Sequence, residues 1–126
     1  MDPKIRYDWE LLPEYVTAQQ FARCLGRILM SLPLRVRCKV TRPLVGSATL
    51  IAQGIAGANA EAPADAPLSA EDREVFRRTA IQAVRICRTG LGLLREEGLG
   101  SRPDHLVAVE LLERIERSVQ ERALPA

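Results

Sequence analysis

The most informative absence in this chain is an absence of charge. No acidic residue stands between Glu14 and Glu61, and residues 43–60 carry no charge of either sign. A helix without a charged side has no face that favours water, so we expect residues 43–60 to be covered by the rest of the fold or by copies of the same chain. This expectation guides the interpretation of the whole sequence.

Aromatic residues are also scarce. Only five of the 126 residues are Phe, Tyr or Trp, whereas 47% are hydrophobic, so Leu, Ile, Val and Ala must fill most of the core. This mixture favours helices packed along their lengths over a β-sandwich. A chain of 126 residues can enclose one core but has no room for a second domain. We therefore predict a single all-α domain over residues 1–126.

Cysteine is rare and shows no paired spacing. The three cysteines are Cys24, Cys38 and Cys87, and the first ten residues contain five charges without the apolar run of a signal peptide. This pattern indicates reduced, buried thiols and a cytoplasmic protein. Because glycines and polar residues interrupt residues 43–60, we predict no membrane-spanning helix.

Apolar periodicity predicts four helices, at about residues 13–31, 33–57, 70–97 and 102–122. Their apolar stripes are, in chain order, Ala18, Phe21, Leu25 and Ile28; Val40, Leu44, Ala48, Ile51 and Ile55; Phe76, Ala80, Ala83, Cys87, Gly90 and Leu94; and Ala108, Leu112, Ile115 and Val119. Ser69 with Asp72, and Ser101 with Asp104, have the spacing of helix-start caps. Two short connections and a longer, mobile one over residues 59–68 predict an antiparallel up-down-up-down four-helix bundle.

The second predicted helix has one competing interpretation. Charged and apolar residues alternate over residues 35–41, which locally is typical of a strand, and Pro43 should remove one helical hydrogen bond and bend the axis. We prefer the helix because its apolar stripe continues across the proline. Small residues should let a neighbouring backbone approach it, inside the fold or in another copy, and the expected packing residues are Gly46, Leu50, Ile51, Gly54, Ile55 and Gly57.

Motifs for catalysis, cofactors and metals are missing as well. His105 is the only histidine, and with the three cysteines it offers one possible zinc ligand per predicted helix. Without a chelating pair we expect no metal site, and we expect His105 to be exposed near a helix start. No Glu-x-x-His motif occurs, and the apolar stripes contain no carboxylate. We therefore predict no enzyme, no cofactor and no small-molecule substrate.

Basic residues provide the main candidate for binding. Arg35, Lys39 and Arg42 are spaced to share one face of a helix, and Arg23 and Arg27 extend this basic row from the first helix. On one hypothesis the row contacts the phosphates of a nucleic acid. On the other hypothesis the row is a solvated face or one side of a subunit interface. This is possible because the net charge of +2 is lower than is usual for a domain that binds nucleic acid.

Two other features are expected to be structural. Arg78, Arg85 and Arg88 form a second basic row, in which Arg78 should pair with Glu74 four residues earlier, and Glu110 with Arg114 and Glu113 with Arg117 have the same favourable spacing. The aromatic residues Tyr7, Trp9 and Tyr15 could stack bases, but aromatic side chains at a bundle end more often seal the core or contact another copy.

Three segments together carry a resemblance to a known family. The first helix reads Leu-Pro-Glu-Tyr-Val over residues 12–16, the second contains Leu-Ile-Ala-Gln-Gly over residues 50–54, and the third ends Leu-Leu-Arg-Glu-Glu-Gly-Leu over residues 93–99. In order and spacing they resemble the bacterial four-helix-bundle family that includes proteins encoded in ribosomal RNA intervening sequences and the accessory variability determinant of diversity-generating retroelements. Leu50 and Gln53 stand where the family has Asn and Glu, so the chain resembles a divergent member.

The resemblance implies a cytoplasmic, non-enzymatic bundle that assembles into a closed homo-oligomeric ring, commonly a pentamer, with RNA, DNA or a reverse transcriptase as partner in some relatives. The charge distribution suits a ring, because residues 1–60 hold eight basic and four acidic residues whereas residues 61–126 hold ten and twelve. We therefore expect an oligomeric scaffold or adaptor that docks a nucleic acid or nucleoprotein through the basic row. The alternative is a purely protein-binding homo-oligomeric assembly without nucleic-acid affinity.

Overall fold

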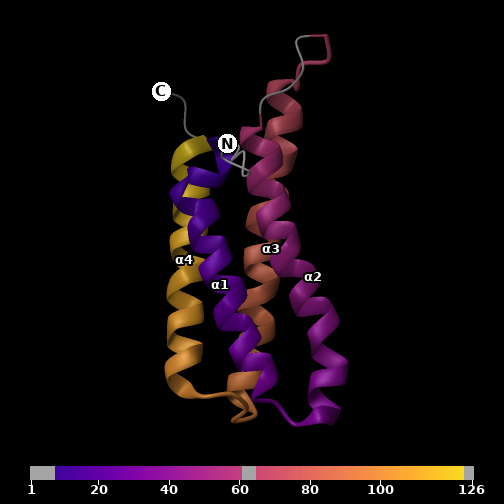
Figure 1. Cartoon of the computed structure of the whole chain (residues 1–126), viewed down its shortest axis with the longest axis vertical. Coiled ribbons are helices and arrows are strands. Elements are labelled where there is room, and N and C mark those ends of the chain that lie inside the picture. Colours follow the sequence, from indigo (N-terminus) through magenta and orange to yellow (C-terminus); the bar gives the residue numbers. More distant parts are fainter. Residues whose placement is uncertain (1–7, 61–64, 124–126) are drawn as a thin grey trace, which may run out of the picture.

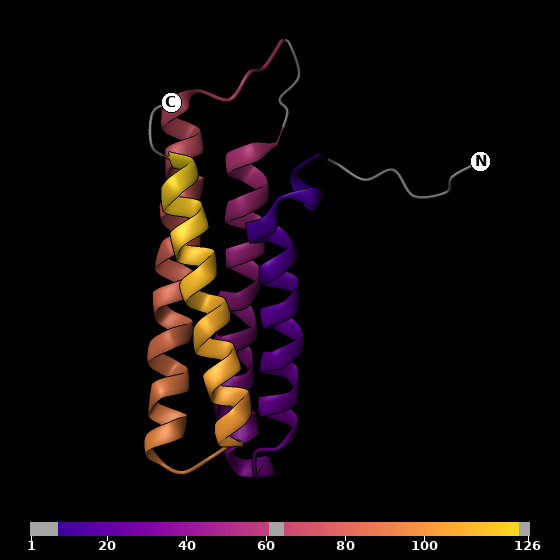
Figure 2. The same ribbon diagram turned by 90° about the vertical axis from the view of Figure 1, so that its left-hand side faces the viewer.

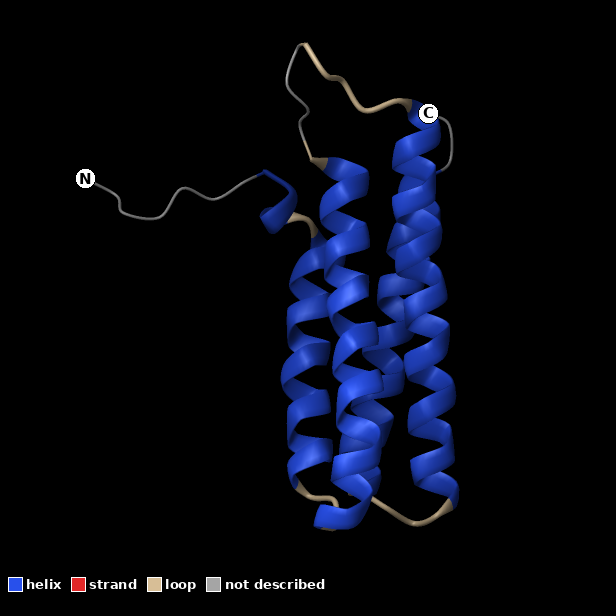
Figure 3. Ribbon diagram, turned by 90° about the vertical axis from the view of Figure 1, so that its right-hand side faces the viewer, coloured by secondary structure: helices blue, strands red, loops and turns tan. Residues whose placement is uncertain are grey.

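The computed structural model describes residues 8–60 and 65–123 of the chain. A short 3-10 helix, η1 (Asp8–Leu11), precedes α1 (Pro13–Met30), α2 (Leu34–Asn59), α3 (Ala70–Glu96) and α4 (Arg102–Ala123). The described residues contain no strand (Figure 3). The prediction of an all-α four-helix protein is confirmed, and each helix begins and ends within two residues of the predicted position.

Successive helices run in opposite directions, and they surround one core (Figures 1 and 2). α1 packs between α2 and α4, and α3 packs between the same two neighbours on the other side of the core. The contact between α2 and α3 is the most extensive of the four. The strand-like alternation over residues 35–41 is helical, because it lies within α2, and α2 continues through Pro43.

Local signals at the helix starts account for the boundaries. α1 begins at Pro13, whose fixed φ suits the first helical turn. At α3 the predicted cap forms a full capping box: the amide of Asp72 donates to Ser69 Oγ at 3.0 Å, and the Asp72 carboxylate accepts from the amide of Ser69 at 3.3 Å. At α4 the amide of Asp104 donates to Ser101 Oγ at 3.2 Å. Both predicted caps are confirmed.

A glycine ends α3. Gly98 has a φ of +71°, a left-handed conformation that residues with a side chain rarely adopt. The turn is closed by the amide of Leu99, which donates to the carbonyl of Leu94 at 2.9 Å. The chain can therefore turn back into α4 within a few residues.

The core is formed by the predicted apolar stripes. Most of their members are buried, namely Ala18, Phe21, Leu25, Ile28, Leu44, Ile51, Ile55, Ala80, Ala83, Cys87, Leu94, Ala108, Leu112, Ile115 and Val119. Val40 and Ala48 are half-buried and pack against this cluster. Since each stripe contributes to one continuous core, the bundle is held together mainly by aliphatic burial.

Glycines let α2 and α3 approach each other closely. A Cβ atom on Gly54 would lie 2.7 Å from the carbonyl oxygen of Phe76 and 2.8 Å from the amide nitrogen of Ala80. A Cβ on Gly57 would collide with the Phe76 ring. By contrast, nothing lies within 4 Å of a Cβ placed on Gly46. Of the three glycines expected to admit a neighbouring backbone, Gly54 does so inside the chain, and Gly57 instead makes room for the Phe76 side chain.

Two expectations about single residues are wrong. Cys38 is exposed, although Cys24 and Cys87 are buried as expected. His105 is buried, not exposed, and its Nε2 lies 2.6 Å from the carbonyl oxygen of Leu99. The reason is that residue 105 is in phase with the apolar stripe of α4, so its ring points into the core despite its place near the helix start.

The core also contains a carboxylate that the sequence analysis missed. Glu14 in the first turn of α1 is buried, and it accepts two hydrogen bonds from the guanidinium of Arg122 near the end of α4. This bidentate ion pair joins the start of α1 to the last turn of α4. Glu14 lies one turn before Ala18, so it extends the stripe of α1 by a carboxylate that was not predicted to be buried.

Part of the predicted connection over residues 59–68 lies outside the described residues, as does Tyr7. The side chain of Trp9 is likewise outside the described part of the structure. Tyr15 is half-buried and packs against the core cluster, as expected for an aromatic residue that seals one end of the bundle.

Candidate interaction surfaces

The uncharged part of α2 is only half covered within one chain. Leu44, Ile51 and Ile55 face the core, whereas Val45 and Leu50 are exposed on the outer side of the helix. Exposed apolar residues that gather on one surface commonly mark a site of interaction. The covering expected for residues 43–60 is therefore provided on one side of α2 and is missing on the other.

An apolar groove runs between α1 and α2. It has a volume of about 270 Å³, and no charged residue lines it. Small side chains create it, because Ala22 and Gly26 of α1 face Ala48 and Ala52 of α2 across the groove. We call it the α1–α2 groove.

A second apolar surface lies on the other side of α2, where α2 meets α3. Towards the end of α3 there is a hollow of about 380 Å³ lined by residues that include Val40 and Pro43 of α2 and Leu93 of α3, with Glu97 as its one charged residue. A neighbouring hollow of about 380 Å³ is lined by residues that include Leu50 and Val75, with Arg78 as its one charged residue. Ile86 lines both. We define the α2–α3 face by the outward residues along this surface, which are Pro43, Gly46, Leu50, Val75, Thr79, Gln82, Ile86 and Leu93.

The contribution of α3 to this surface was not predicted from the sequence. On α3 the face repeats at Val75, Thr79, Gln82, Ile86 and Leu93, beside the core stripe rather than within it. These five residues are visible in the sequence as an uncharged row at helical spacing. The signal is weak because two of the five residues are polar, so hydrophobicity alone does not reveal it.

The cations of the basic row differ in their ion-pair partners. Arg35, Lys39 and Arg42 are exposed on the first half of α2, and they form no ion pair with any other described residue, as is also true of Arg23 on α1. Arg27 differs, because its Nε lies 3.6 Å from the Asp104 carboxylate on α4. Part of its charge is thus compensated within the chain.

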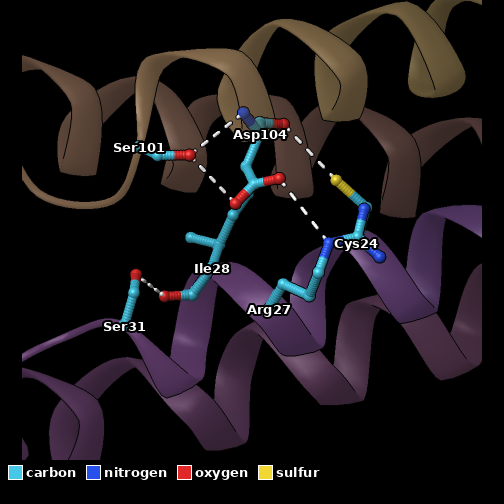
Figure 4. Close-up of polar contacts among 6 residues, drawn as sticks. All are labelled: Cys24, Arg27, Ile28, Ser31, Ser101 and Asp104. Atoms are coloured by element: carbon cyan, nitrogen blue, oxygen red, sulfur yellow. Dashed lines mark hydrogen bonds and ion pairs between the residues drawn. The ribbon is translucent and has the colours of Figure 1, made fainter.

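A polar cluster surrounds this ion pair (Figure 4). The Asp104 carboxylate also accepts a hydrogen bond from Ser101 Oγ at 2.9 Å, and the backbone carbonyl of Asp104 accepts one from Cys24 Sγ at 3.3 Å. The cluster fixes the first turn of α4 against α1. We interpret it as a structural contact and not as a reactive centre.

The chemistry of the buried thiols supports that interpretation. Desolvation by burial raises the pKa of Cys24, an effect larger than the opposing influence of the Arg27 charge. Burial raises the pKa of Cys87 to about 12. Because the thiolate is the nucleophilic form of cysteine, neither residue has the environment of a reactive thiol at neutral pH.

The second basic row is largely paired on the surface, as expected. Arg78 lies 3.5 Å from the Glu74 carboxylate. Arg85 lies 3.3 Å from Glu116 and so bridges α3 to α4. The predicted pair of Glu110 with Arg114 is also present, at 2.6 Å.

Within residues 8–60 and 65–123, no group of three or more His, Cys, Asp or Glu side chains is arranged to hold a metal ion. In the same ranges, no helix has the length and apolar character needed to cross a membrane. Comparisons with known protein families, with curated proteins and with solved structures find no match for this chain. The resemblance described above therefore stays a prediction.

Proposed function

We propose that this protein is a non-enzymatic scaffold that associates with copies of itself through the uncharged outer surface of α2. One observation carries the proposal: α2 has no charge after Arg42, yet it exposes Val45 and Leu50 with an apolar surface on either side. Burying such a surface gains about 25 cal/mol for each Å² of apolar area and removes no charge from water.

The number of copies in the assembly depends on which surfaces of the chain contact each other. The resemblance implies a closed ring, commonly of five copies, and a ring joins two different surfaces of each chain. The α1–α2 groove and the α2–α3 face lie on opposite sides of α2 and would suit that role. A dimer needs only one self-complementary surface.

The basic row is the proposed docking surface for a partner. Arg35, Lys39 and Arg42 stand on successive turns of α2 without an internal acidic partner among the described residues, so their charges are available to the phosphates of RNA, DNA or a nucleoprotein such as a reverse transcriptase. Arg27 is a weaker candidate because Asp104 already pairs with it. The alternative function is an assembly that binds only proteins.

Two measurements test the proposal. Sedimentation or native mass spectrometry of the full chain should show a particle heavier than the 14.0 kDa of one chain. A monomer at all concentrations would refute self-association. Titration of RNA and DNA at increasing salt separates the two partner hypotheses, because phosphate contacts must weaken as salt rises. Absence of binding at low salt by the intact oligomer would leave the protein-binding alternative.

A further inference from the structure

We propose that the α2–α3 face pairs with the same face of a second copy, in an antiparallel arrangement about a two-fold axis that crosses the helices between Leu50 and Ile86. The proposal rests on the self-association proposed above and adds its surface and symmetry. A two-fold pair uses one surface on both copies, so it gives a dimer or an even-numbered assembly in place of a five-membered ring.

The composition of the face selects a second copy as its occupant. Its four large apolar side chains remain substantially exposed in one chain, at 42% for Leu50, 58% for Val75, 44% for Ile86 and 59% for Leu93. Its other members are uncharged, and the charged residues that line its hollows are Arg78, which already pairs with Glu74, and Glu97. A partner with charged groups against the apolar side chains would lose their hydration without gaining an opposite charge there. An identical face brings apolar side chains against these apolar side chains, which avoids that cost at the centre of the contact.

The spacing of the apolar residues determines the orientation. Val75 and Leu93 are separated along α3 by roughly 27 Å, at 1.5 Å per residue, and residue 84 lies halfway between them. Gly54 lies beside Ala80, and Leu44 lies beside Gly90. Interpolation between these two contacts sets the level of residue 84 at about residue 50 of α2. Leu50 and Ile86 thus lie near the midpoint, with Val75 and Leu93 at similar distances on either side.

A two-fold axis at this midpoint, perpendicular to the helices, brings apolar side chains of the two copies to the same levels. It brings Val75 of one copy to the level of Leu93 of the other. It brings Leu50 to the level of Leu50 in the second copy, so these two apolar side chains meet near the axis. A two-fold axis parallel to the helices would instead keep every residue at its own level. Leu93 would then lie against the basic row of the second copy.

The size of the face suits a specific but modest association. A strip roughly 27 Å long and two helices wide, with each helix about 10 Å across, covers on the order of 540 Å² on each copy. Two such strips sum to about 1,100 Å², near the ~1,000 Å² that a specific interface needs. We therefore expect a dimer whose population depends on concentration.

Cysteine cross-linking tests the orientation. In a Cys38→Ser background the two remaining cysteines are buried, so a new surface cysteine is the reactive one. Mixing the Val75→Cys chain with the Leu93→Cys chain should give a disulfide-linked dimer at least about tenfold faster than either chain alone, because only the antiparallel pair brings these positions within disulfide reach. Mass spectrometry of the linked peptides identifies the bond.

The outcomes separate this proposal from the function on which it rests. Faster linkage of either chain to itself, or an oligomer in which positions 75 and 93 do not link, would overturn the antiparallel pairing but leave self-association standing. A particle of five times 14.0 kDa without that linkage would favour the ring. A chain that stays monomeric would overturn both.

A matched pair of substitutions tests the surface independently. Leu50 and Val16 are each 42% exposed, but Val16 lies on α1, away from the α2–α3 face. Leu50→Lys should weaken dimerisation at least about tenfold in Kd, because it brings an unpaired charge into the contact. Val16→Lys should leave Kd unchanged, and circular dichroism should show both chains folded. Equal effects of the two substitutions would contradict the proposed surface.

Discussion

The two halves of the bundle are held together by different kinds of contact. α1 and α4 are joined by ion pairs, with Glu14 and Arg122 at one end and Arg27 and Asp104 at the other. α2 and α3 are joined mainly by close packing at Gly54, Gly57 and Gly90, and no ion pair links these two helices in the described ranges. Ion pairs thus connect the two helices of one side, whereas the other side exposes a face whose large side chains are apolar. This difference locates the proposed association on the α2–α3 side.

The largest expected effect comes from disturbing the close packing. Gly54→Ala places a methyl group 2.7 Å from the Phe76 carbonyl oxygen and 2.8 Å from the Ala80 amide, both backbone atoms that cannot turn aside. We expect a loss of about 3 kcal/mol in the free energy of unfolding, at the upper end of typical overpacking effects, measured by urea denaturation.

Gly92→Ala in the same helix pair is the control for that experiment. Nothing lies within 4 Å of a Cβ at position 92, so alanine should stabilise α3 by about 0.5–1 kcal/mol through its higher helix propensity. If both alanine substitutions change stability in the same direction, close packing at Gly54 does not hold α2 to α3.

The ion pair on the other side should give the next largest effect. Arg122→Ala leaves the buried Glu14 carboxylate without its partner. Breaking a fully buried pair costs about 3–5 kcal/mol, but the Arg122 side chain is 40% exposed, so we expect a loss of about 2 kcal/mol. Adding Glu14→Gln should restore part of the lost stability, because it removes the unpaired charge. A double variant less stable than Arg122→Ala alone would contradict this account.

The same comparison extends to the cations available for binding. Lys39→Gln removes a cation with no internal partner, whereas Arg27→Gln removes one that already pairs with Asp104. If the chain binds RNA or DNA, Lys39→Gln should lower the slope of log K against log salt by about one and weaken binding more than Arg27→Gln does. Equal effects of the two substitutions would mean that the internal pair does not reduce the availability of Arg27.

Most of the fold could be predicted because each helix has a strong periodic stripe and recognisable ends. Caps at Ser69 and Ser101 and the glycine stop at Gly98 are local signals, so the sequence carries them directly. The contacts that distinguish the two halves are not local. Glu14 meets Arg122 from the other end of the chain, and its place in the first turn of α1 resembled an ordinary helix-start acid.

The candidate surfaces were harder to predict for the same reason. The absence of charge on α2 is visible in the sequence. The packing of α3 against Gly54 decides which side of α2 is covered and which side faces solvent, and this packing is not a local property of the sequence. For the basic row, spacing identifies the cations but not their partners. Asp104, from a helix that lies far along the chain, pairs with Arg27.

The reactivity of the three thiols tests the comparison between the two halves of the bundle at single residues, and it is the smallest of the expected effects. Cys38 is exposed on α2, whereas Cys24 lies between α1 and α4 and Cys87 lies in the core. Burial raises the pKa of both buried thiols, to about 12 for Cys87, so at neutral pH they are protonated as well as inaccessible. Iodoacetamide followed by mass spectrometry should therefore modify Cys38 alone in the native protein and all three cysteines in urea. Rapid native modification of Cys24 would show that the contact between α1 and the first turn of α4 opens readily, and the ion-paired half would then be the looser of the two.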